Sequence, residues 1–544
     1  MKVALCQLNY HIGDFEGNTE KIVNAIHFAK DQDADLAIFS ELSVCGYPPR
    51  DFLEFNSFIE KASKSVHKIA RECDNIKAIV GAPYQNPKEK GKKLYNSAYL
   101  LGQKKILSVH HKGLLPTYDI FDEKRYFENG EDFKTENING KKVAITICED
   151  IWNEEEGNIY QTEPLEKLYK ENPEIIINIS ASPFNHQKSE KRANTLNKNA
   201  KRYNTPIIYV NQTGGNTELI FDGGSCIINN HGQYYHTSKH FGEDLNILEL
   251  NDLNSKNDLT PPKRSKSERI YNALLTGIRD YFEKSGFKTA VIGLSGGIDS
   301  AMTAALASRA LGNNNVRCVL MPSKYSSDHS VTDSERLIKN LGCRSDHINV
   351  EDIHSLYIKT LNEHFNNEIK EITEENIQAR LRAVLLMAIS NNFNEVLLNT
   401  TNKSEAAVGY GTLYGDMCGG LSVIGDVYKT ELYELADYIN KNIDNVIPKN
   451  ILQKAPSAEL KPNQKDTDTL PDYETLDSIL YRYIEERKSN YEIIKEGFDD
   501  DLVNKVLNLI NKNEYKRYQT PPILRVSPKA FGIGRRMPIV ADYG

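Results

Sequence analysis

The sequence predicts an α/β protein of two domains, an N-terminal layered α/β domain followed by a doubly wound parallel sheet. Three observations lead to this prediction. The chain has 544 residues, which is too long for a single hydrophobic core. Short β-rich runs alternate with segments of helical spacing. A polar, proline-containing stretch at 251–267 separates two regions of different pattern.

The first region, up to about residue 250, contains short apolar runs rich in β-branched residues, which predict strands. Apolar residues recur with helical spacing around 19–30 and 58–71. The predicted strands are 3–8, 36–39, 78–81, 97–101, 143–147, 175–179, 207–210 and 226–228. Strands and helices in this order indicate a layered α/β domain.

The second region is predicted as a separate domain, 268–544, joined to the first domain, 1–250, by a linker at 251–267. Its predicted strands alternate with helices, among them a helix at 331–341. These strands are 289–294, 316–321, 347–350 and 395–399. Such an alternation is typical of a parallel sheet that binds a nucleotide at the carboxyl ends of its strands.

Composition excludes several classes of function. The net charge of −8 argues against nucleic acid as a partner, because phosphate contacts need clustered Lys and Arg. No apolar run approaches the length of a bilayer span, and the first residues lead directly into a predicted strand. The eight cysteines form no C-x-x-C pair, so neither a zinc site nor a disulfide framework is indicated. We expect a cytoplasmic protein with reduced thiols and no membrane partner.

A glycine-rich loop follows the predicted strand 289–294: Ser295-Gly296-Gly297-Ile298-Asp299-Ser300. A strand, a Gly-Gly turn and a helix N-terminus direct several N–H groups at one point, which suits phosphate oxygens. The common ATP loop has a lysine here, whereas this loop has Asp299, which indicates Mg²⁺. A plain strand-to-helix turn is the alternative, but it needs neither the serines nor the aspartate. The loop resembles that of ATP pyrophosphatases, which cut ATP between the α and β phosphates.

A second candidate site is formed by Glu41, Lys112 and Cys148, each of which stands where an apolar run stops. If the three strands end at one edge of a sheet, these residues supply a general base, an oxyanion stabiliser and a nucleophile. A buried cysteine alone is more often a small hydrophobic residue. The surrounding segments 39–48 (FSELSVCGYP), 111–127 (HKGLLPTYDIFDEKRYF) and 147–152 (ICEDIW) nevertheless resemble the Glu, Lys and Cys segments of the nitrilase superfamily.

Together the two halves resemble the glutamine-dependent NAD⁺ synthetases over essentially the whole chain. Further matching segments are 210–223, 321–327, 376–382, 400–405, 413–417, 456–460 and 464–466, with Thr213 and Thr401 as small departures. The resemblance implies an N-terminal αββα nitrilase-like sandwich followed by a Rossmann-like domain of the adenine nucleotide alpha hydrolase type. It also implies that deamido-NAD⁺ is amidated to NAD⁺ through an adenylate, with ammonia from glutamine.

The resemblance assigns roles to individual residues. For glutamine binding it implies Tyr47, Tyr118, Phe121, Glu123, Glu149, Ser180 and Ser182. For ATP binding it implies the loop Ser295–Ser300 with Arg380, Thr400, Lys429 and Ser457. For deamido-NAD⁺ binding it implies Asn376, Lys403, Glu405 and Asp416. Mg²⁺ is expected on Asp299 and Glu405, and the chain is expected to form a homo-oligomer.

Three alternatives share part of these features. A GMP or asparagine synthetase would share the phosphate loop but carries another amidotransferase domain. An amidase–ligase acting on an unrelated acid would keep both sites but lose the segments 376–382 and 414–416. A nucleotide-binding scaffold without activity is disfavoured because both sets of candidate catalytic residues are intact. Identification of the products made from ATP, glutamine and candidate acids would distinguish these alternatives.

Overall fold

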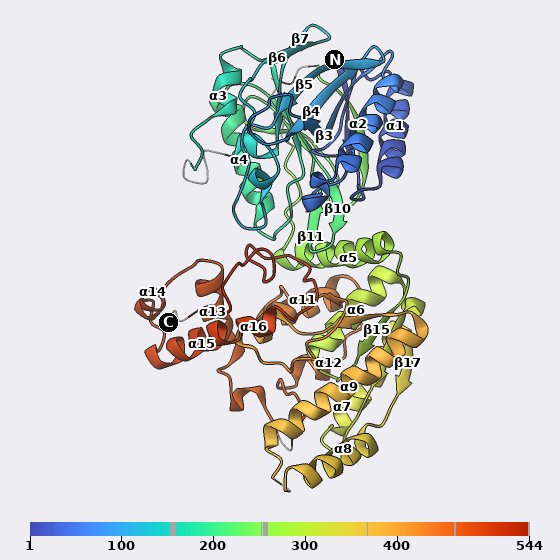
Figure 1. The fold of residues 1–544 in the computed structure, drawn as a ribbon, viewed down its shortest axis with the longest axis vertical. Helices are drawn as coiled ribbons and strands as arrows, with labels where there is room; N and C mark the ends of the chain where they lie inside the picture. Colours follow the sequence, from blue (N-terminus) through green and yellow to red (C-terminus); the bar gives the residue numbers. More distant parts are fainter. Residues whose placement is uncertain (153–158, 252, 254–258, 367, 462–463, 542–544) are drawn as a thin grey trace. The chain divides into compact units, whose positions relative to one another are not determined.

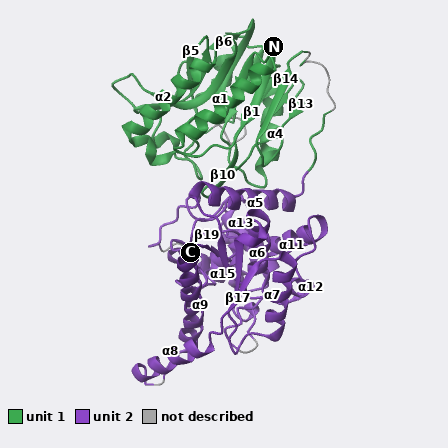
Figure 2. Ribbon diagram, turned by 90° about the vertical axis from the view of Figure 1, so that its right-hand side faces the viewer, with its two compact units in different colours: residues 1–263 green, residues 264–544 purple. Residues whose placement is uncertain are grey.

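A computed structural model describes residues 1–152, 159–251, 253, 259–366, 368–461 and 464–541. The chain divides into two compact units, Met1–Lys263 (unit 1) and Arg264–Gly544 (unit 2; Figure 2). The boundary between them falls inside the range 251–267, of which residues 252 and 254–258 lie outside the described part. Helix α5 (Lys266–Ser285) begins one residue before the predicted end of that range.

Unit 1 contains two six-stranded mixed sheets. The first has the order β14 (Asp244–Glu249), β1 (Lys2–Gln7), β2 (Leu36–Ile38), β3 (Lys77–Gln85), β4 (Leu94–Gly102) and β5 (Lys105–His111). The second has the order β13 (Tyr234–Thr237), β12 (Cys226–Ile228), β9 (Ile207–Asn211), β8 (Ile175–Ser180), β7 (Lys141–Ile147) and β6 (Thr135–Ile138). A short hairpin joins β10 (Thr213–Asn216) to β11 (Leu219–Asp222).

The two sheets face each other and each carries a pair of helices. The helices α1 (Phe15–Asp31) and α2 (Asn56–Glu72) pack on the first sheet, whereas α3 (Pro164–Tyr169) and α4 (Lys188–Arg202) pack on the second (Figure 1). Between the sheets, Val3 and Leu5 of β1 share one core with Ile145 of β7 and Ile177 of β8. Alternate residues of β1, Ala4 and Cys6, face the helices instead. This confirms the αββα sandwich.

The sequence pattern predicted α1 and α2 but not α4. In α1, Ile22, Ala25, Ile26 and Ala29 recur with helical spacing and are buried. The buried face of α4 is largely polar, with Arg192, Thr195 and Asn199 beside Leu196 and Ala200. A helix whose buried face is polar shows no helical spacing of apolar residues, so the sequence pattern does not predict it.

Unit 2 contains a five-stranded parallel sheet with helices on both faces, which confirms the doubly wound fold. Its order is β17 (Arg344–His347), β16 (Val316–Leu320), β15 (Ala290–Gly293), β18 (Val396–Asn399) and β19 (Leu421–Ser422). The helices after α5 that frame the site are α6 (Ile298–Leu311), α7 (Asp328–Leu341), α8 (Glu351–His364), α9 (Glu371–Phe393), α10 (Lys403–Val408), α11 (Lys429–Asn442) and α12 (Lys449–Gln453). The chain order reverses beside β15, which opens a crevice at its carboxyl end.

The rest of unit 2 is a helical cluster that the sequence analysis did not predict. It consists of α13 (Tyr473–Ile484), α14 (Asn490–Lys495), α15 (Asp500–Lys512) and α16 (Glu514–Arg517). The first three share a core with α10. The strand predicted at 347–350 is also corrected, because β17 covers the polar residues 344–347 and Val350 already caps α8. Among the described helices, none is long and apolar enough to cross a membrane.

A buried ion pair fastens α4 to β11 in unit 1. The guanidinium of Arg192 donates to both oxygens of Asp222, at 2.7 and 2.8 Å, and to the carbonyl of Gly223 at 2.8 Å. Burial alone would raise the pKa of Asp222, but the Arg192 charge overrides burial and holds that pKa well below its usual range.

We predict that Arg192→Met destabilises unit 1 by about 3–5 kcal/mol, because a buried carboxylate is left unpaired. The loss should shrink once the pH falls below about 4, where Asp222 in the unfolded chain is protonated. Arg202→Met, on the same helix, is the control, since that arginine pairs with Glu166 at the surface and should contribute about 1 kcal/mol or less. Scanning calorimetry of the full chain measures both. Equal shifts in the two variants would contradict the prediction.

Candidate functional site

The first site lies at strand ends in unit 1. Glu41 follows β2, and Lys112 comes directly after β5, which runs in the same direction as β2 within the first sheet. Cys148 comes directly after β7, which belongs to the second sheet. The expectation that all three come from one sheet edge is therefore wrong. Two facing sheets, rather than one, bring the three side chains to a common point.

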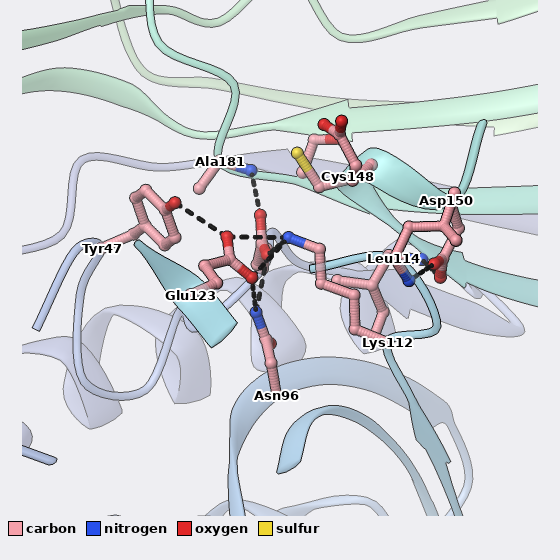
Figure 3. A network of polar contacts seen from close by, with 12 residues as sticks. Tyr47, Asn96, Lys112, Leu114, Glu123, Cys148, Asp150 and Ala181 are labelled. Carbon is pink, nitrogen blue, oxygen red and sulfur yellow. Dashed lines mark hydrogen bonds and ion pairs between the residues drawn. The ribbon is translucent and has the colours of Figure 1, made fainter. Parts of the chain in front are cut away.

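One buried ammonium joins two carboxylates at this point (Figure 3). Lys112 Nζ lies 2.7 Å from Glu41 Oε1 and 2.8 Å from both oxygens of Glu123. Burial alone would lower the pKa of Lys112, but the two carboxylates raise it well above its usual value. Burial raises the pKa of Glu123, an effect that Lys112 partly opposes. The lysine is thus held as a cation in a site without solvent.

Three neutral donors complete the surroundings of the carboxylates. Asn96 Nδ2 donates to Glu41 Oε1 at 2.7 Å, and the main-chain N–H of Ala181 donates to Glu41 Oε2 at 3.0 Å. Tyr47 donates its hydroxyl to Glu123 Oε1 at 2.8 Å (Figure 3). Both oxygens of Glu41 are therefore fixed in direction. Sequence reasoning missed Asn96, which carries no signal of its own inside an apolar strand.

The thiol of Cys148 is buried beside this cluster, at the first residue of the short 3₁₀ helix η3 (Cys148–Ile151). Its backbone adopts a left-handed conformation, with φ = 42°, which is uncommon for a residue with a side chain and is often found at functional sites. Burial and then the Glu41 charge raise the pKa of the thiol well above its usual value, whereas Lys112 lowers it. The thiol is protonated at rest, so a neighbouring base must remove its proton before it can attack.

Asp150 ties the two loops of the site together. Its carboxylate accepts hydrogen bonds from the N–H groups of Gly113, Leu114 and Ile147, each at 2.9 Å. Burial raises the pKa of Asp150 to about 7. These bonds join the loop that follows Lys112 to the turn that carries Cys148, a link between distant segments that the sequence could not show.

A further buried carboxylate, Glu149, belongs to the residue that follows Cys148. Tyr118 and Tyr160 donate their hydroxyls to Glu149 Oε1 at 2.8 and 3.0 Å. Burial raises the pKa of Glu149, and the largest opposing effect comes from Lys188, whose ammonium lies 3.8 Å from the centre of the Trp152 ring. Sequence reasoning predicted Tyr118 and Glu149 but missed Tyr160 and Lys188.

The other residues predicted for this site lie close by. The ring of Phe121 packs edge-on against that of Tyr118, with centroids 5.5 Å apart. Ser180 ends β8 and donates to Asn178, and the N–H of Ser182 donates to Asn211. These serines flank Ala181, the residue whose N–H holds Glu41.

The second site is a cavity of about 280 Å³ at the carboxyl end of β15 in unit 2. All six residues of the loop Ser295–Ser300 line it, and α6 begins inside the loop at Ile298. Gly296 has φ = 80°, and a Cβ atom there would lie 2.5 Å from the carbonyl oxygen of Ser330. A side chain at position 296 is therefore disfavoured for two reasons, the positive φ and the close approach of Ser330. Of the other residues predicted to bind substrates, the cavity is lined by Thr400, Glu405, Asp416, Lys429 and Ser457.

Asp299 and Glu405 converge on one lysine inside the cavity. Lys429 Nζ lies 2.7 Å from Asp299 Oδ2 and 3.1 Å from Glu405 Oε1. Asn402 donates to Asp299 Oδ1 at 2.7 Å and caps the helix α10 that carries Glu405. Burial raises the pKa of Glu405, an effect that Lys429 opposes. Within the described ranges, no three His, Cys, Asp or Glu residues form a metal-binding group.

Three predicted residues are not brought to the cavity wall. Lys403 is fully buried elsewhere, where its ammonium pairs with Asp426 at 2.9 Å and with Glu485. Asn376 instead accepts a hydrogen bond from Thr412 at 2.7 Å. Arg380 is exposed and donates to a backbone carbonyl. For Lys403 and Arg380 the structure argues against direct ligand contact, since one serves a buried ion network and the other faces solvent.

Arg382, which the sequence analysis did not select, faces the cavity in place of Arg380. In α9 the lining residues are Ala379, Arg382, Ala383 and Leu386, a spacing that marks one helix face. Burial lowers the pKa of Arg382, so its guanidinium would gain from an anionic ligand. Two residues along a helix correspond to about 200° of rotation, which explains why the neighbouring arginine points away.

The two units match different family models. Residues 2–254 match the model described as carbon-nitrogen hydrolase, and residues 270–520 match the model described as NAD synthase. The fold and the two sites therefore define a two-part enzyme, a carbon-nitrogen hydrolase unit joined to an NAD synthase unit.

Full-length relatives specify the family. The chain is 46% identical to the glutamine-dependent NAD(+) synthetase of Synechocystis sp., with 99% of each chain covered. It is 40% identical to that of Thermotoga maritima, with 100% of this chain and 99% of the relative covered. The solved structure of the Acinetobacter baumannii enzyme with ADP is 39% identical, covers 99% of this chain and 98% of its own, and gives a TM-score of 0.78. The chain belongs to the glutamine-dependent NAD(+) synthetase family.

We predict that Arg382→Gln raises the KM for ATP about tenfold or more, because a charged contact to an anionic ligand contributes about 1.5–3 kcal/mol. Arg380→Gln removes the same charge two residues away and should change this KM less than about twofold. Steady-state kinetics at saturating glutamine measure both variants. A larger effect from the Arg380 variant would restore the sequence-based choice.

Proposed function

We propose that this chain converts deamido-NAD⁺, ATP and glutamine to NAD⁺, AMP, diphosphate and glutamate. One observation carries the proposal: a single chain holds the Glu41–Lys112–Glu123 cluster beside a buried thiol and, in a separate cavity, a glycine-rich loop without lysine. The full-length relatives support it, since they are named for this activity. Their names also disfavour the GMP and asparagine synthetase alternatives. Homo-oligomer formation remains a prediction.

In unit 1, Glu41 would take the thiol proton while Cys148 Sγ attacks the glutamine carboxamide carbon. Lys112 would stabilise the negative charge that develops on the carbonyl oxygen. When the C–N bond breaks, Glu41 returns the proton to the leaving nitrogen and ammonia departs. A water molecule, deprotonated by Glu41, then hydrolyses the thioester to glutamate and regenerates the thiol.

Recognition of free glutamine would use two charges, Glu149, which follows Cys148 in the chain, and Lys188, whose charge acts on Glu149. The α-ammonium group of the substrate suits the Glu149 carboxylate, and its α-carboxylate suits the ammonium of Lys188. The two tyrosine donors and the nearby Lys188 charge support this assignment, because they favour the charged form of Glu149 and the tyrosines fix its orientation. A peptide-bonded glutamine has neither charge, which would make the site selective for the free amino acid.

In unit 2, the N–H groups of Ser295–Ser300 would bind the ATP phosphates, with Lys429 and Arg382 as cationic partners. The substrate carboxylate would attack the α-phosphorus and release diphosphate, and ammonia would then displace AMP from the adenylate. Asp299 and Glu405 fit Mg²⁺, since two hard carboxylates already share one cation beside the phosphate loop. The metal would supply charge neutralisation for the departing diphosphate.

The proposed function is tested by following oxygen. Deamido-NAD⁺ labelled with ¹⁸O in its carboxylate is incubated with the protein, ATP, Mg²⁺ and glutamine, and the products are analysed by mass spectrometry. We expect NAD⁺, glutamate, diphosphate and AMP that carries one labelled oxygen, because the carboxylate oxygen leaves with the phosphorus. Formation of ADP, or of unlabelled AMP, would refute the adenylate route.

We predict that Cys148→Ala abolishes NAD⁺ synthesis from glutamine but retains synthesis from ammonium salts at mildly alkaline pH. Without the thiol, Glu41 has no proton to take and Lys112 has no oxyanion to stabilise. Ammonia supplied in solution can still reach the adenylate, and alkaline pH raises the unprotonated fraction. Glutamate release and NAD⁺ formation are measured separately. A variant that releases glutamate at the parent rate would show that Cys148 is structural.

A further inference from the structure

We propose that Asn96 is a positioning residue of the glutamine-hydrolysing site. Its side chain allows two carboxylates to share one lysine. The proposal rests on the function proposed for Cys148 and Glu41. Asn96 lies near the beginning of β4, between the strands that precede Glu41 and Lys112 in the order of the first sheet. Its side chain is 1% exposed.

Asn96 contacts all three charged members of the cluster, the two carboxylates through its side-chain nitrogen and Lys112 through its main-chain carbonyl. Its Nδ2 donates to Glu41 Oε1 at 2.7 Å and lies 3.4 Å from Glu123 Oε2. Its main-chain carbonyl accepts the N–H of Lys112 at 2.8 Å. The side-chain nitrogen thus bridges the two carboxylates (Figure 3). The backbone bond fixes the origin of the lysine side chain.

The chemistry of the neighbours determines the orientation of the amide group. Rotation by 180° would place Oδ1 against two carboxylate oxygens, where no proton is available to separate them. In the observed orientation Oδ1 is buried and meets no hydrogen-bond donor among the described residues. A buried acceptor without a donor is unfavourable. This unfavourable burial of Oδ1 is offset because, in the same orientation, Nδ2 donates to Glu41 and faces Glu123.

A neutral donor is the group that this position requires. Glu41 and Glu123 carry two negative charges against the single positive charge of Lys112. A lysine or arginine at 96 would neutralise the base, and an aspartate would add a third carboxylate. The amide adds hydrogen bonds to the carboxylates without changing the net charge. Glu41 therefore keeps one orientation toward the reacting atoms while it gains and loses a proton.

The experiment compares two substitutions of similar size. Asn96→Asp keeps the shape but removes the donor and adds charge, whereas Asn96→Leu removes the donor without adding charge. Tyr99→Phe is the matched control. Tyr99 also lies on β4, and the substitution removes its buried hydrogen bond to the carbonyl of Pro83 on β3. The readouts are kcat and KM for glutamine hydrolysis, NAD⁺ synthesis from ammonium salts, and the rate of iodoacetamide alkylation of Cys148, measured by peptide mass spectrometry.

We expect kcat at pH 7.5 to fall at least about 100-fold in Asn96→Asp and at least about tenfold in Asn96→Leu. The KM for glutamine should change less than about twofold, alkylation of Cys148 should slow, and ammonia-dependent synthesis should persist. Tyr99→Phe should resemble the parent. If Asn96 only fills space, Asn96→Asp keeps the parent kcat, and the proposal is overturned.

Two further outcomes keep the test decisive. If Asn96→Asp does not fold, as judged by the calorimetric transition of unit 1, Asn96→Leu decides: parent values of kcat and of the alkylation rate would overturn the proposal. Cys148→Ala is measured in parallel. If that variant still hydrolyses glutamine, the proposed function of unit 1 fails. If it does not, while both Asn96 variants hydrolyse glutamine normally, only the role of Asn96 fails.

Discussion

The glutamine-hydrolysing half of this protein depends on one ammonium group buried between two carboxylates. Lys112 Nζ, with Glu41 and Glu123 within 2.8 Å, is stable there because attraction between the ammonium and the two carboxylates offsets their desolvation. Loss of Lys112 would leave two carboxylates without a counter-charge in the interior. The other partners of the carboxylates are neutral donors, and one of them, the N–H of Ala181, comes from the segment that follows β8 of the second sheet.

Unit 2 repeats the same physical arrangement with a different use. There Lys429 lies between Asp299 and Glu405, again with an asparagine, Asn402, that donates to one carboxylate. In unit 1 the central lysine lies beside a buried thiol, whereas in unit 2 it lines a cavity next to the glycine-rich loop. A lysine paired with two acids keeps its charge when buried, yet remains able to exchange part of its contacts for an anionic ligand. Unrelated folds have thus reached one electrostatic solution for two reactions.

The sequence predicted these features unevenly, and the reason is the range of the interactions. Residues at strand ends, such as Glu41, Lys112 and Cys148, follow a local pattern that a sequence displays. The choice between Arg380 and Arg382 depends on which face of α9 is turned toward the cavity. The local sequence does not determine this rotation. Lys403 was expected at a ligand but pairs with Asp426 and Glu485, which are far away along the chain. From the sequence alone, a lysine that binds a ligand cannot be distinguished from one that pairs with buried carboxylates.

The contact between Asp150 and the loop after Lys112 has a mechanical consequence. Because one carboxylate holds N–H groups from both loops, neither loop can shift without carrying the other. Thermal breathing of the sandwich would displace thiol and ammonium together and leave their separation nearly constant. The distance between the two reacting groups would therefore depend little on the slower motions of the two sheets.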